Sequence, residues 1–516
     1  MAEESSPRMA VDAPGRAVKA AENAIYGMVE FAWPIVPSLV VTPLLVRGLG
    51  ESAFGVLSIM AVTMGFLGLL DLGIGGAAIR TIAQHAERND LDAAARVLGT
   101  VVTTYFLIGL FGGTALALAV PLLVGPVLSV PADLQSGASA AFYVSALGFP
   151  VLMAIGAFAA VPKALQRFDL AMRVSVVFAT IGPLLALTVV RAGLGLPGLA
   201  VSSLFLNLVA GMVYFGVSRR LLRGAPLRLG IDVALLRGLA AFGGWFLVAS
   251  FGVAILYQLD KVLVGSFLGV AAVTYYVVPG NLANRIQGFM GAATLVVFPI
   301  SAGLSARGDT AVLHRLYRDG TRFTFILSAM LGVPMAVFAE PFLRYWMGAD
   351  FAGHSRIVMV LLVGTYVLLG LAGVAWGVAF GLGRAKINAI FALLMGAIDI
   401  GLFLVLVGPY QLTGAAAAYL ASAAIGVPMV IGYVERKVLG FRGWDCLIQY
   451  ARVLPAVAVQ VALAVTLTSI ARSLLLTLVA MALTAVALPI LYLLMGLATA
   501  SDRALLGQVV ARIKPR

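Results

Sequence analysis

The sequence predicts an all-α membrane protein with about fourteen transmembrane helices, and three observations support this fold class. The 516 residues are 62% hydrophobic and only 11% charged, with a mean hydropathy of +1.05, whereas soluble domains carry about 25% charged residues. Apolar runs that reach the roughly 20 residues a helix needs to cross a bilayer follow one another along the chain. The breaks between them are short, which leaves no room for a soluble domain of ordinary size.

The elements in chain order are an N-terminal tail and a series of spans. The polar residues 1–23 contain no apolar core, so they are expected to form a cytoplasmic tail rather than a cleaved signal peptide. The single cysteine, Cys446, excludes an intramolecular disulfide. The expected spans cover residues 24–47, 52–72, 97–121, 139–161, 170–190, 197–217, 240–262, 273–303, 321–343, 354–380, 386–408, 412–434, 450–470 and 474–498.

The positions of the basic residues predict the orientation of these spans. An even number of spans puts both termini on one side, and 28 of the 35 Lys and Arg residues fall in the tails and loops of that side. The opposite side carries five, and Lys261 and Arg285 lie within spans. Because basic residues concentrate in cytoplasmic loops, both termini are expected in the cytoplasm. The same loops explain the net charge of +13, and with no soluble basic module nucleic-acid binding is not expected.

A weak internal repeat predicts two similar halves. The stretch "TPLLVRGLGESAFG" (42–55) aligns with "KVLVGSFLGVAAVT" (261–274), and "PGLAVSSLFLN" (197–207) aligns with "TGAAAAYLASA" (413–423) at nearly the same offset. Six spans separate the copies, so the copies share one orientation, as in a common transporter plan. Chance similarity between helices rich in Ala, Gly and Leu is the alternative. The expected parts are the tail, an N-lobe at 24–217, a cytoplasmic linker at 218–239, a C-lobe at 240–434, two extra spans within 435–498 and a cytoplasmic C-terminal tail at 499–516.

Two charges of opposite sign stand side by side in the seventh expected span. Asp260 and Lys261 lie in "AILYQLDKVLVGSFLG" (254–269), and each charge inside a bilayer costs roughly 2.5–3.5 kcal/mol on insertion scales. Tyr257 precedes Asp260 and Lys261 by three and four residues, so the three side chains can share one helix face. The face is expected to meet a wet cavity. The structural alternative is that Lys261 only neutralises Asp260 and joins neighbouring helices.

The eighth expected span carries a polar stripe. In "PGNLANRIQGF" (279–289), Asn281, Asn284 and Arg285 repeat the helical spacing of the previous group. A cation and two amides on one face of a membrane helix are expected to face the bundle interior or water. Arg285 and Lys261 are therefore candidate substrate-binding residues.

Other charged residues within or near spans are candidates for ion coupling or for anchoring. Glu30 lies in the first span, Asp71 in the second and Asp399 in the eleventh, and with Asp260 they are candidates to bind a proton or cation. Arg80 stands near the cytoplasmic mouth, where it can meet an anionic substrate or reach the interface as an anchor. Pro34 and Pro37 are expected to kink the first span next to Glu30.

Signatures of several enzyme classes are missing from the sequence. The chain has no nucleotide-binding glycine loop and no HExxH helix, and neither His85 nor His314 has metal-ligand neighbours. The outer loops are too short and too poorly charged for a glycosyltransferase or polymerase site. A transporter without enzymatic activity, metal or cofactor is expected.

The sequence resembles a known transporter family at two places. "LLVRGLGESAFGVLSI" with "LLDLGIGGAAIRTIAQ" looks like the first two spans of polysaccharide-repeat flippases, and "LDKVLVGSFLGVAAVTYYVVPGNLANRI" is similar to their seventh and eighth spans. These O-antigen and exopolysaccharide flippases belong to the multidrug/oligosaccharidyl-lipid/polysaccharide exporter superfamily. The resemblance covers about residues 24–440.

The resemblance implies two six-helix lobes around a central cavity that opens to alternate faces of a bacterial inner membrane. It implies transport of an undecaprenyl-diphosphate-linked oligosaccharide to the periplasmic leaflet, driven by a proton or sodium gradient. Its implied partners are membrane lipids and the polysaccharide polymerase and chain-length machinery. The family's cationic cavity residues match Lys261, Arg285 and Arg80 here. The "DK" at 260–261 replaces the commoner "DR", which keeps the charge but loses bidentate phosphate geometry.

Three other functions stay open at this point. A lipid II flippase would share the fold, although the first span here carries Glu30 and no arginine before Arg47. A cation-coupled drug antiporter would favour an acidic cavity without Lys261 and Arg285. A membrane scaffold would not need the charges within spans.

Overall fold

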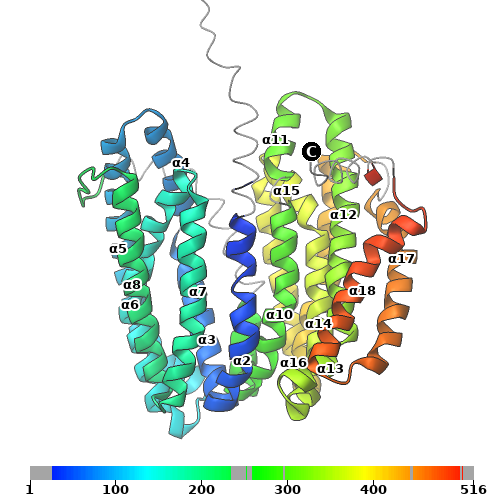
Figure 1. Cartoon of the computed structure of the whole chain (residues 1–516), viewed down its shortest axis with the longest axis horizontal. Helices are drawn as coiled ribbons and strands as arrows, with labels where there is room; N and C mark the ends of the chain where they lie inside the picture. Colours follow the sequence, from blue (N-terminus) through cyan, green and yellow to red (C-terminus); the bar gives the residue numbers. More distant parts are fainter. Residues whose placement is uncertain are drawn as a thin grey trace, which may run out of the picture. The chain divides into compact units, whose positions relative to one another are not determined.

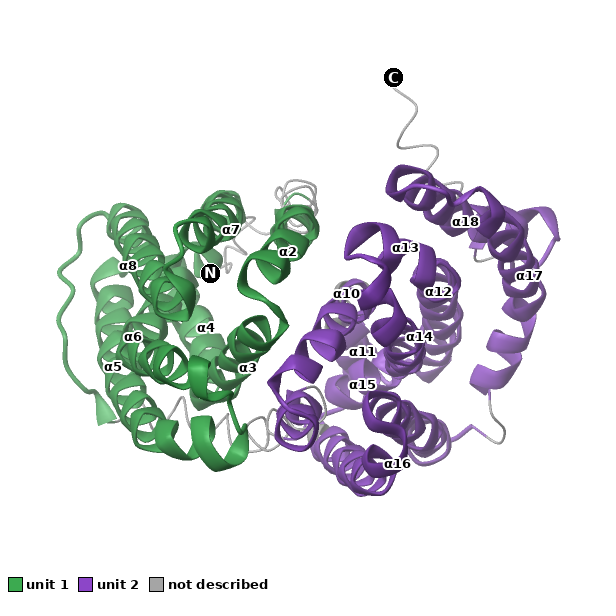
Figure 2. Cartoon of the chain, turned by 90° about the horizontal axis from the view of Figure 1, so that it is seen from below, with its two compact units in different colours: residues 1–247 green, residues 248–516 purple. Residues whose placement is uncertain are grey.

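The computed structural model describes residues 22, 26–71, 73–233, 252, 258–294, 297–441, 445–499 and 502–503. These residues form sixteen α-helices and no strand. Eleven helical segments are long and apolar enough to cross a membrane, so the predicted helical, multi-pass class is confirmed. The contacts divide the chain into two compact units, Met1–Leu247 and Val248–Arg516, shown in Figure 2.

The described helices of unit 1 each cover one of the first six expected spans, with α4 as an additional element. They are α2 (Ile35–Leu49), α3 (Glu51–Gly68), α4 (Ile74–Glu87), α5 (Leu91–Leu122), α6 (Ala132–Ala164), α7 (Phe168–Arg191) and α8 (Gly195–Leu221). In Figure 1, α5, α6 and α8 lie side by side, and contacts join α6 to both α5 and α8. The α7 helix packs against α8 and α2.

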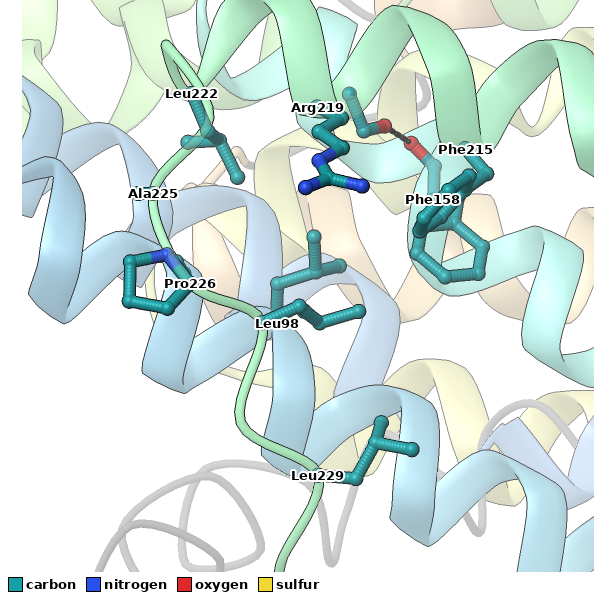
Figure 3. A pocket seen from close by; sticks show the side chains of 11 residues that line it. Leu98, Phe158, Phe215, Arg219, Leu222, Ala225, Pro226 and Leu229 are labelled. Carbon is teal, nitrogen blue, oxygen red and sulfur yellow. Dashed lines mark hydrogen bonds between the residues drawn. The ribbon is translucent and has the colours of Figure 1, made fainter.

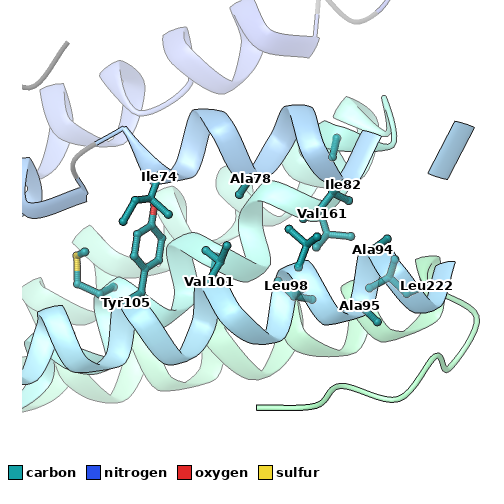
Figure 4. Packing of buried hydrophobic residues seen from close by; sticks show 14 of the residues in the cluster. Ile74, Ala78, Ile82, Ala94, Ala95, Leu98, Val101, Tyr105, Val161 and Leu222 are labelled. Carbon is teal, nitrogen blue, oxygen red and sulfur yellow. The ribbon is translucent and has the colours of Figure 1, made fainter. Parts of the chain in front are cut away.

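The buried centre of unit 1 lies where α4, α5 and α6 meet (Figure 4). Ala78 of α4, Val101 of α5 and Val161 of α6 are inaccessible to solvent. Tyr105 of α5 and Phe149 of α6 extend the same cluster. Small and branched side chains allow helices to approach closely, which is how helices associate where lipid supplies no hydrophobic driving force. This contact holds α4 on the helix pair.

The first span is interrupted at the place where prolines predicted a kink. Residues 26–32 are helical, Trp33 and Pro34 form a turn, and α2 restarts at Ile35. Pro34 has no amide proton, so it cannot continue the backbone hydrogen bonds of the preceding helix. Pro37 lies in the first turn of α2, where a backbone amide would have no helical partner in any case. The kink therefore arises at Pro34. Trp33 Nε1 donates a hydrogen bond of 2.8 Å to Thr180 Oγ1 of α7.

After α8 the chain crosses the surface of unit 1 in an extended segment, residues 225–232, which we call the strap. Leu222, just before the strap, is 3% exposed and belongs to the buried cluster. The amide of Gly230 donates to Thr103 Oγ1 of α5 at 3.2 Å. These contacts fix the strap on α5.

Unit 2 begins, in its described part, with a helical segment at 258–268. Most of the seventh expected span, 240–262, lies outside the described residues. The other helices are α10 (Val270–Thr294), α11 (Val297–Ala306), α12 (Thr310–Val337), α13 (Ala339–Trp346), α14 (Ala349–Leu371), α15 (Gly373–Gly381), α16 (Ala385–Tyr433), α17 (Asp445–Leu467) and α18 (Leu474–Leu494). The α14 helix packs against α10, α12 and α16.

The long α16 element is a helical hairpin rather than one rod. Gln411 has non-helical backbone angles, φ 47° and ψ −127°, two residues after Pro409. Ser422 Oγ donates to the carbonyl of Met395 at 2.6 Å, so residues 27 positions apart lie side by side. The break separates the two spans expected at 386–408 and 412–434.

The extra helices α17 and α18 pack on α12 in unit 2 (Figure 1). Ala329 of α12, Val453 and Ala456 of α17, and Leu488 and Tyr492 of α18 form one buried cluster. These two helices are therefore an integral part of unit 2.

A buried arginine fastens this arrangement at one end. Arg322 of α12 is 3% exposed and donates to Asp502 Oδ1 at 2.7 Å, to Gln449 Oε1 of α17 at 2.8 Å and to Asp319 Oδ1 at 2.8 Å. Asp502 Oδ2 accepts from Tyr492 of α18 at 3.0 Å. One guanidinium thus connects three helices and the segment after α18.

Candidate functional site

The carboxylate of Asp260 is buried within unit 2 and hydrogen-bonded. Its side chain is 2% exposed, and Oδ2 accepts from the Tyr276 hydroxyl of α10 at 2.8 Å. Oδ1 accepts from the backbone amide of Lys261 at 2.8 Å. Gly269, with φ +86°, stands between the helical segment 258–268 and α10. The turn it permits brings Tyr276 back along the first helix to Asp260.

A second carboxylate lies near the first. Asp399 in the first arm of α16 is 3% exposed, and its charge interacts with that of Asp260. Tyr276 interacts electrostatically with both acids. Asp399 Oδ1 has no hydrogen-bond partner among the described residues. Two buried acids and a phenol with one unfilled acceptor form an arrangement that can hold a proton or a small cation.

Lys261 is buried next to Asp260. Its side chain is 7% exposed, and Nζ donates to Gln258 Oε1 one turn earlier, at 2.9 Å. Its charge also interacts with that of Asp260. Tyr257, predicted to share this face, lies outside the described residues.

The predicted polar stripe lies on one accessible face of α10. Asn281 and Asn284 are exposed and Arg285 is half-buried, whereas Ala283 and Ile286 between and beside them are buried. None of the three polar side chains makes a hydrogen bond or ion pair with the described part of the chain. The structure does not bring Arg285 into contact with Lys261. It presents a cation without a partner among the described residues, next to Asn284 and one helical turn after Asn281 on α10.

Glu30 belongs to a separate network in unit 1. Its Oε1 accepts from Ser175 Oγ of α7 at 3.0 Å and lies 3.4 Å from Lys163 Nζ of α6. Ser175 Oγ in turn lies 3.5 Å from the Tyr214 hydroxyl of α8. Glu30 and Lys163 are 23% and 36% exposed, so water reaches the pair. The carboxylate connects the segment before α2 to three other helices.

Asp71 lies where α3 ends and α4 begins, at the end of the predicted second span. Its Oδ1 accepts from the amide of Gly75 at 2.9 Å and from the Tyr105 hydroxyl of α5. A Cβ at position 75 would stand 2.9 Å from that hydroxyl and 3.2 Å from Oδ1, so a larger residue there would push these two side chains from their present positions. The side chain caps the first turn of α4, because it accepts one of the free amides of that turn.

The last sequence-predicted residue, Arg80, is exposed on α4, and its side chain has no hydrogen-bond or salt-bridge partner within the described ranges. The structure therefore groups Asp260, Lys261 and Asp399 in unit 2. Glu30, Asp71 and Arg80 have no contact with one another among the described residues.

The sequence interpretation missed the neutral partners of the charged residues. Tyr276, Gln258, Ser175, Tyr214 and Tyr105 are polar groups in apolar surroundings, and they were not singled out. The turn at Gly269 could have suggested Tyr276. If the helices before and after this glycine run antiparallel, residues at similar distances from it, such as Asp260 and Tyr276, lie side by side. No comparable local signal exists for Ser175 or Tyr105, which approach their carboxylates from distant helices.

Cavities occur on unit 1 away from these carboxylates. One of about 280 Å³ is mostly apolar, lined by Leu98, Phe158, Phe215 and the strap, with the Arg219 guanidinium among these side chains (Figure 3). No group of three or more His, Cys, Asp or Glu side chains that could hold a metal ion occurs in the portion of the chain described.

Comparisons with known proteins agree with this architecture. The family model described as "Polysaccharide biosynthesis protein" matches residues 44–356, more than half of the chain. A Shigella flexneri protein named "Putative O-antigen transporter" is 23% identical over 408 residues, covering 77% of this chain and 93% of the relative. "Uncharacterized membrane protein EpsK" of Bacillus subtilis is 21% identical over 405 residues, covering 76% and 77%.

Solved transporters share the fold at low sequence identity. An inward-facing multidrug resistance MATE family transporter of the MOP superfamily superposes with a TM-score of 0.64 and 15% identity, covering 82% of this chain and 98% of that one. A MOP superfamily transporter from Pyrococcus furiosus gives a TM-score of 0.56 with 16% identity, covering 81% and 96%. The chain therefore belongs to the polysaccharide biosynthesis protein family, a family of membrane transporters rather than enzymes, and has the fold of the MOP superfamily.

Proposed function

We propose that this protein is a flippase that moves undecaprenyl-diphosphate-linked oligosaccharide units from the cytoplasmic to the periplasmic leaflet by alternating access. The family and the O-antigen transporter relative support a polysaccharide-related transporter. The headgroup of such a substrate carries negative phosphates and hydroxyl-rich sugars. Its passage requires cations and hydrogen-bonding groups on membrane-spanning helices, because an uncompensated charge in low dielectric is costly.

The observation that carries this proposal is the unpaired stripe on α10. A cation that served only to stabilise the fold would be expected to have a protein partner, because charges within membrane helices are otherwise expensive. Arg285 has none among the described residues, and the free amides of Asn281 and Asn284 precede it by four residues and one residue. In this proposal Arg285 meets the diphosphate, and the amides meet sugar hydroxyls. Lys261, buried and bonded to Gln258, adds positive potential nearby rather than a direct phosphate contact.

We assign coupling to a proton or sodium ion to the acids. In unit 2 the pair Asp260 and Asp399, with Tyr276, offers two carboxylates whose negative charges repel unless a proton or cation is shared between them. Glu30 and Asp71 are candidates of the same kind in unit 1. Binding or release at these acids would change which contacts each helix favours during the transport cycle.

The experiment is export of surface glycan in cells whose own flippase gene is deleted. Arg285→Gln is expected to reduce export at least tenfold, since a charge-assisted phosphate contact contributes about 1.5–3 kcal/mol. Arg307→Gln is the matched control, because Arg307 is an exposed arginine at the end of α11. Membrane levels of both variants are measured by immunoblot. Export equal to that of the unmodified protein in Arg285→Gln would contradict the proposal.

A second set of variants separates the two roles of Lys261. If Lys261 serves the substrate, Lys261→Ala stays inactive when Asp260→Asn is added. If Lys261 only balances Asp260, the double variant recovers export. Glycan export and protein level are compared in Lys261→Ala, Asp260→Asn and the double variant.

The same cells distinguish this function from two others of the fold. A lipid II flippase would rescue cells depleted of their peptidoglycan-precursor flippase, and a drug antiporter would raise resistance to cationic dyes. We expect neither. We further propose placement in the bacterial inner membrane with fourteen spans in two six-helix lobes plus two extra helices, and partnership with the polymerase and chain-length machinery.

A further inference from the structure

We propose that unit 1 carries a site for a phosphate group, separate from the transport residues, in the cavity between α4, α5 and the strap. The cavity has a volume of about 350 Å³. Its polar lining residues are His85 at the end of α4, Arg96 and Thr100 of α5, and Arg228 and Asp232 of the strap.

The strap holds its part of the site in a fixed place. The carbonyl oxygen of Arg228 lies so close to Gly99 of α5 that a Cβ at position 99 would stand 2.1 Å from it. The hydrogen bond from the Gly230 amide to the Thr103 hydroxyl holds the strap against the next turn of α5. The backbone of Arg228 is therefore anchored while its side chain lines the cavity beside Arg96, which comes from a different element.

The basic side chains of this cavity lack partners among the residues that the structure describes. Neither Arg96, Arg228 nor His85 makes a side-chain hydrogen bond or ion pair within the described residues. Two guanidinium groups at one cavity repel each other, and a bound anion removes that repulsion.

The donor set selects phosphate rather than a generic anion. Each guanidinium presents a planar fork of N–H groups that matches phosphate oxygens, and two forks from different elements can contact one tetrahedral group. The Thr100 hydroxyl is a further donor, and its residue is 5% exposed. Asp232 is the acidic residue of the lining, so two arginines face one carboxylate and the lining stays positive. The neighbouring apolar cavity of Figure 3 has only Arg219 and offers no such set.

The phosphate can come from an anionic lipid headgroup or from solution. The cavity lies at the ends of α4 and α5 that we propose to be cytoplasmic, where anionic lipids attract basic segments. Both sources present the same group to Arg96 and Arg228. The site does not depend on the proposed flippase function, because binding can be read from stability alone.

The test is thermal unfolding of the purified full-length chain in detergent, followed by intrinsic fluorescence. Phosphatidylglycerol, inorganic phosphate and diacylglycerol, which lacks phosphate, are titrated separately. We expect a saturable rise in the unfolding midpoint with phosphatidylglycerol and none with diacylglycerol. In the double variant Arg96→Gln/Arg228→Gln the apparent affinity should fall at least tenfold. The backbone of Arg228, not its side chain, contacts α5, so the strap is expected to stay in place.

The control is Arg88→Gln/Arg219→Gln, which removes the same charge from unit 1 without touching the cavity lining of the site. Retained affinity in this control supports the site. A rise with phosphatidylglycerol and with inorganic phosphate, both lost in the site variant, shows recognition of the phosphate group itself. A rise with the lipid alone shows that the headgroup source is required. No rise with either, an unchanged response in the site variant, or equal loss in the control overturns the proposal.

Discussion

Two carboxylates of the candidate sites, Glu30 and Asp260, differ in exposure and in the kind of partner that they have. Glu30 is partly exposed and has a lysine counter-charge at 3.4 Å. Asp260 is 2% exposed, and neutral donors, the Tyr276 hydroxyl and a backbone amide, bind its two oxygens. A partly solvated ion pair contributes little to stability, whereas a buried carboxylate depends on every hydrogen bond it accepts. Substitutions at the two sites should therefore have different consequences.

Glu30→Gln is expected to change the free energy of unfolding by only about 0–1 kcal/mol, since the pair with Lys163 is partly exposed. If Glu30 exchanges a proton or cation, transport should nevertheless slow. Unfolding in SDS and glycan export measure the two effects. A matched control is Glu340→Gln, which breaks the more exposed pair with Arg356. Normal export in Glu30→Gln would remove Glu30 from the coupling residues.

Asp71→Ala should destabilise the protein by about 1–3 kcal/mol, because the amide of Gly75 and the Tyr105 hydroxyl both lose their acceptor. Asp71→Asn keeps an acceptor oxygen and should retain most of the stability. Unfolding in SDS of the two variants gives the comparison. Equal losses in both would mean that the negative charge, not the hydrogen bonds, stabilises this junction.

The sequence was sufficient to find the charged residues of the candidate site but not their partners. A charge in an apolar run is visible locally, which is why Asp260, Lys261 and Asp399 could be named. Their grouping depends on how three helices pack, and Ala, Gly and Leu-rich helix surfaces do not specify that packing in one sequence. Serine is a common residue type, and nothing in the local sequence marks Ser175. Only the tertiary fold brings its hydroxyl to the Glu30 carboxylate.

At the scale of elements, the attachment of α17 and α18 to α12 depends on two arginines with different surroundings. Arg322 is 3% exposed, whereas the side chain of Arg318, which pairs with Asp445 at 2.6 Å, is 48% exposed. Changing either arginine to Gln removes one positive charge from α12. The two substitutions therefore compare an exposed interaction with a buried one on the same helix.

Arg322→Gln is expected to cost about 1–3 kcal/mol, since Asp502, which is 21% exposed, and Gln449 lose the hydrogen bonds of a buried guanidinium. Arg318→Gln should cost about 0–1 kcal/mol. Unfolding in SDS measures both, and protease sensitivity of the C-terminal helices reports whether α17 and α18 detach. Similar small losses in both variants would show that apolar packing alone holds these helices.

The same attachment should weaken in acid. Burial alone would raise the pKa of Asp502, but hydrogen bonds from Arg322 and Thr499 outweigh it and hold the pKa below its ordinary value. A lowered folded-state pKa gives stabilisation that is present above the unfolded value of about 3.9 and is lost as the pH falls through the folded value. The stability difference between the unmodified protein and Asp502→Asn should therefore shrink below about pH 4. A constant difference from pH 7 to pH 3 would contradict this.

The sequence predicted helix boundaries well where a proline or a polar turn ended an apolar run. Where no such residue marks the boundary, the prediction was less accurate. The kink at Pro34 and the break between the two arms of α16 were predictable, because proline removes a helical hydrogen bond. The α4 helix was not expected, because the residues between the spans 52–72 and 97–121 were assigned to a cytoplasmic loop. The tight turn Leu69–Asp71 and Gly73, which has φ +76°, separate α4 from α3.

For the whole molecule, the distribution of basic residues makes a topology prediction. A reporter fused after Arg516 should be read in the cytoplasm, and one inserted near Ala132, at the start of α6, should be read in the periplasm. The split of 28 basic residues against five supports both positions. Alkaline phosphatase and green fluorescent protein fusions measure them. Periplasmic readout at Arg516 would contradict the fourteen-span model with both termini in the cytoplasm.

The hairpin of α16 also has a consequence for how the protein is made. Its two arms leave the ribosome with only the short turn around Gln411 between them, and an 18-residue window within Lys386–Val438 has a mean hydropathy of 2.6. A first arm held alone in the bilayer would leave the Asp399 carboxylate without the helices that surround it. The second arm follows at once and places Ser422 beside Met395. We therefore expect the translocon to release both arms together, as one insertion step whose product already contains its own interhelical contact.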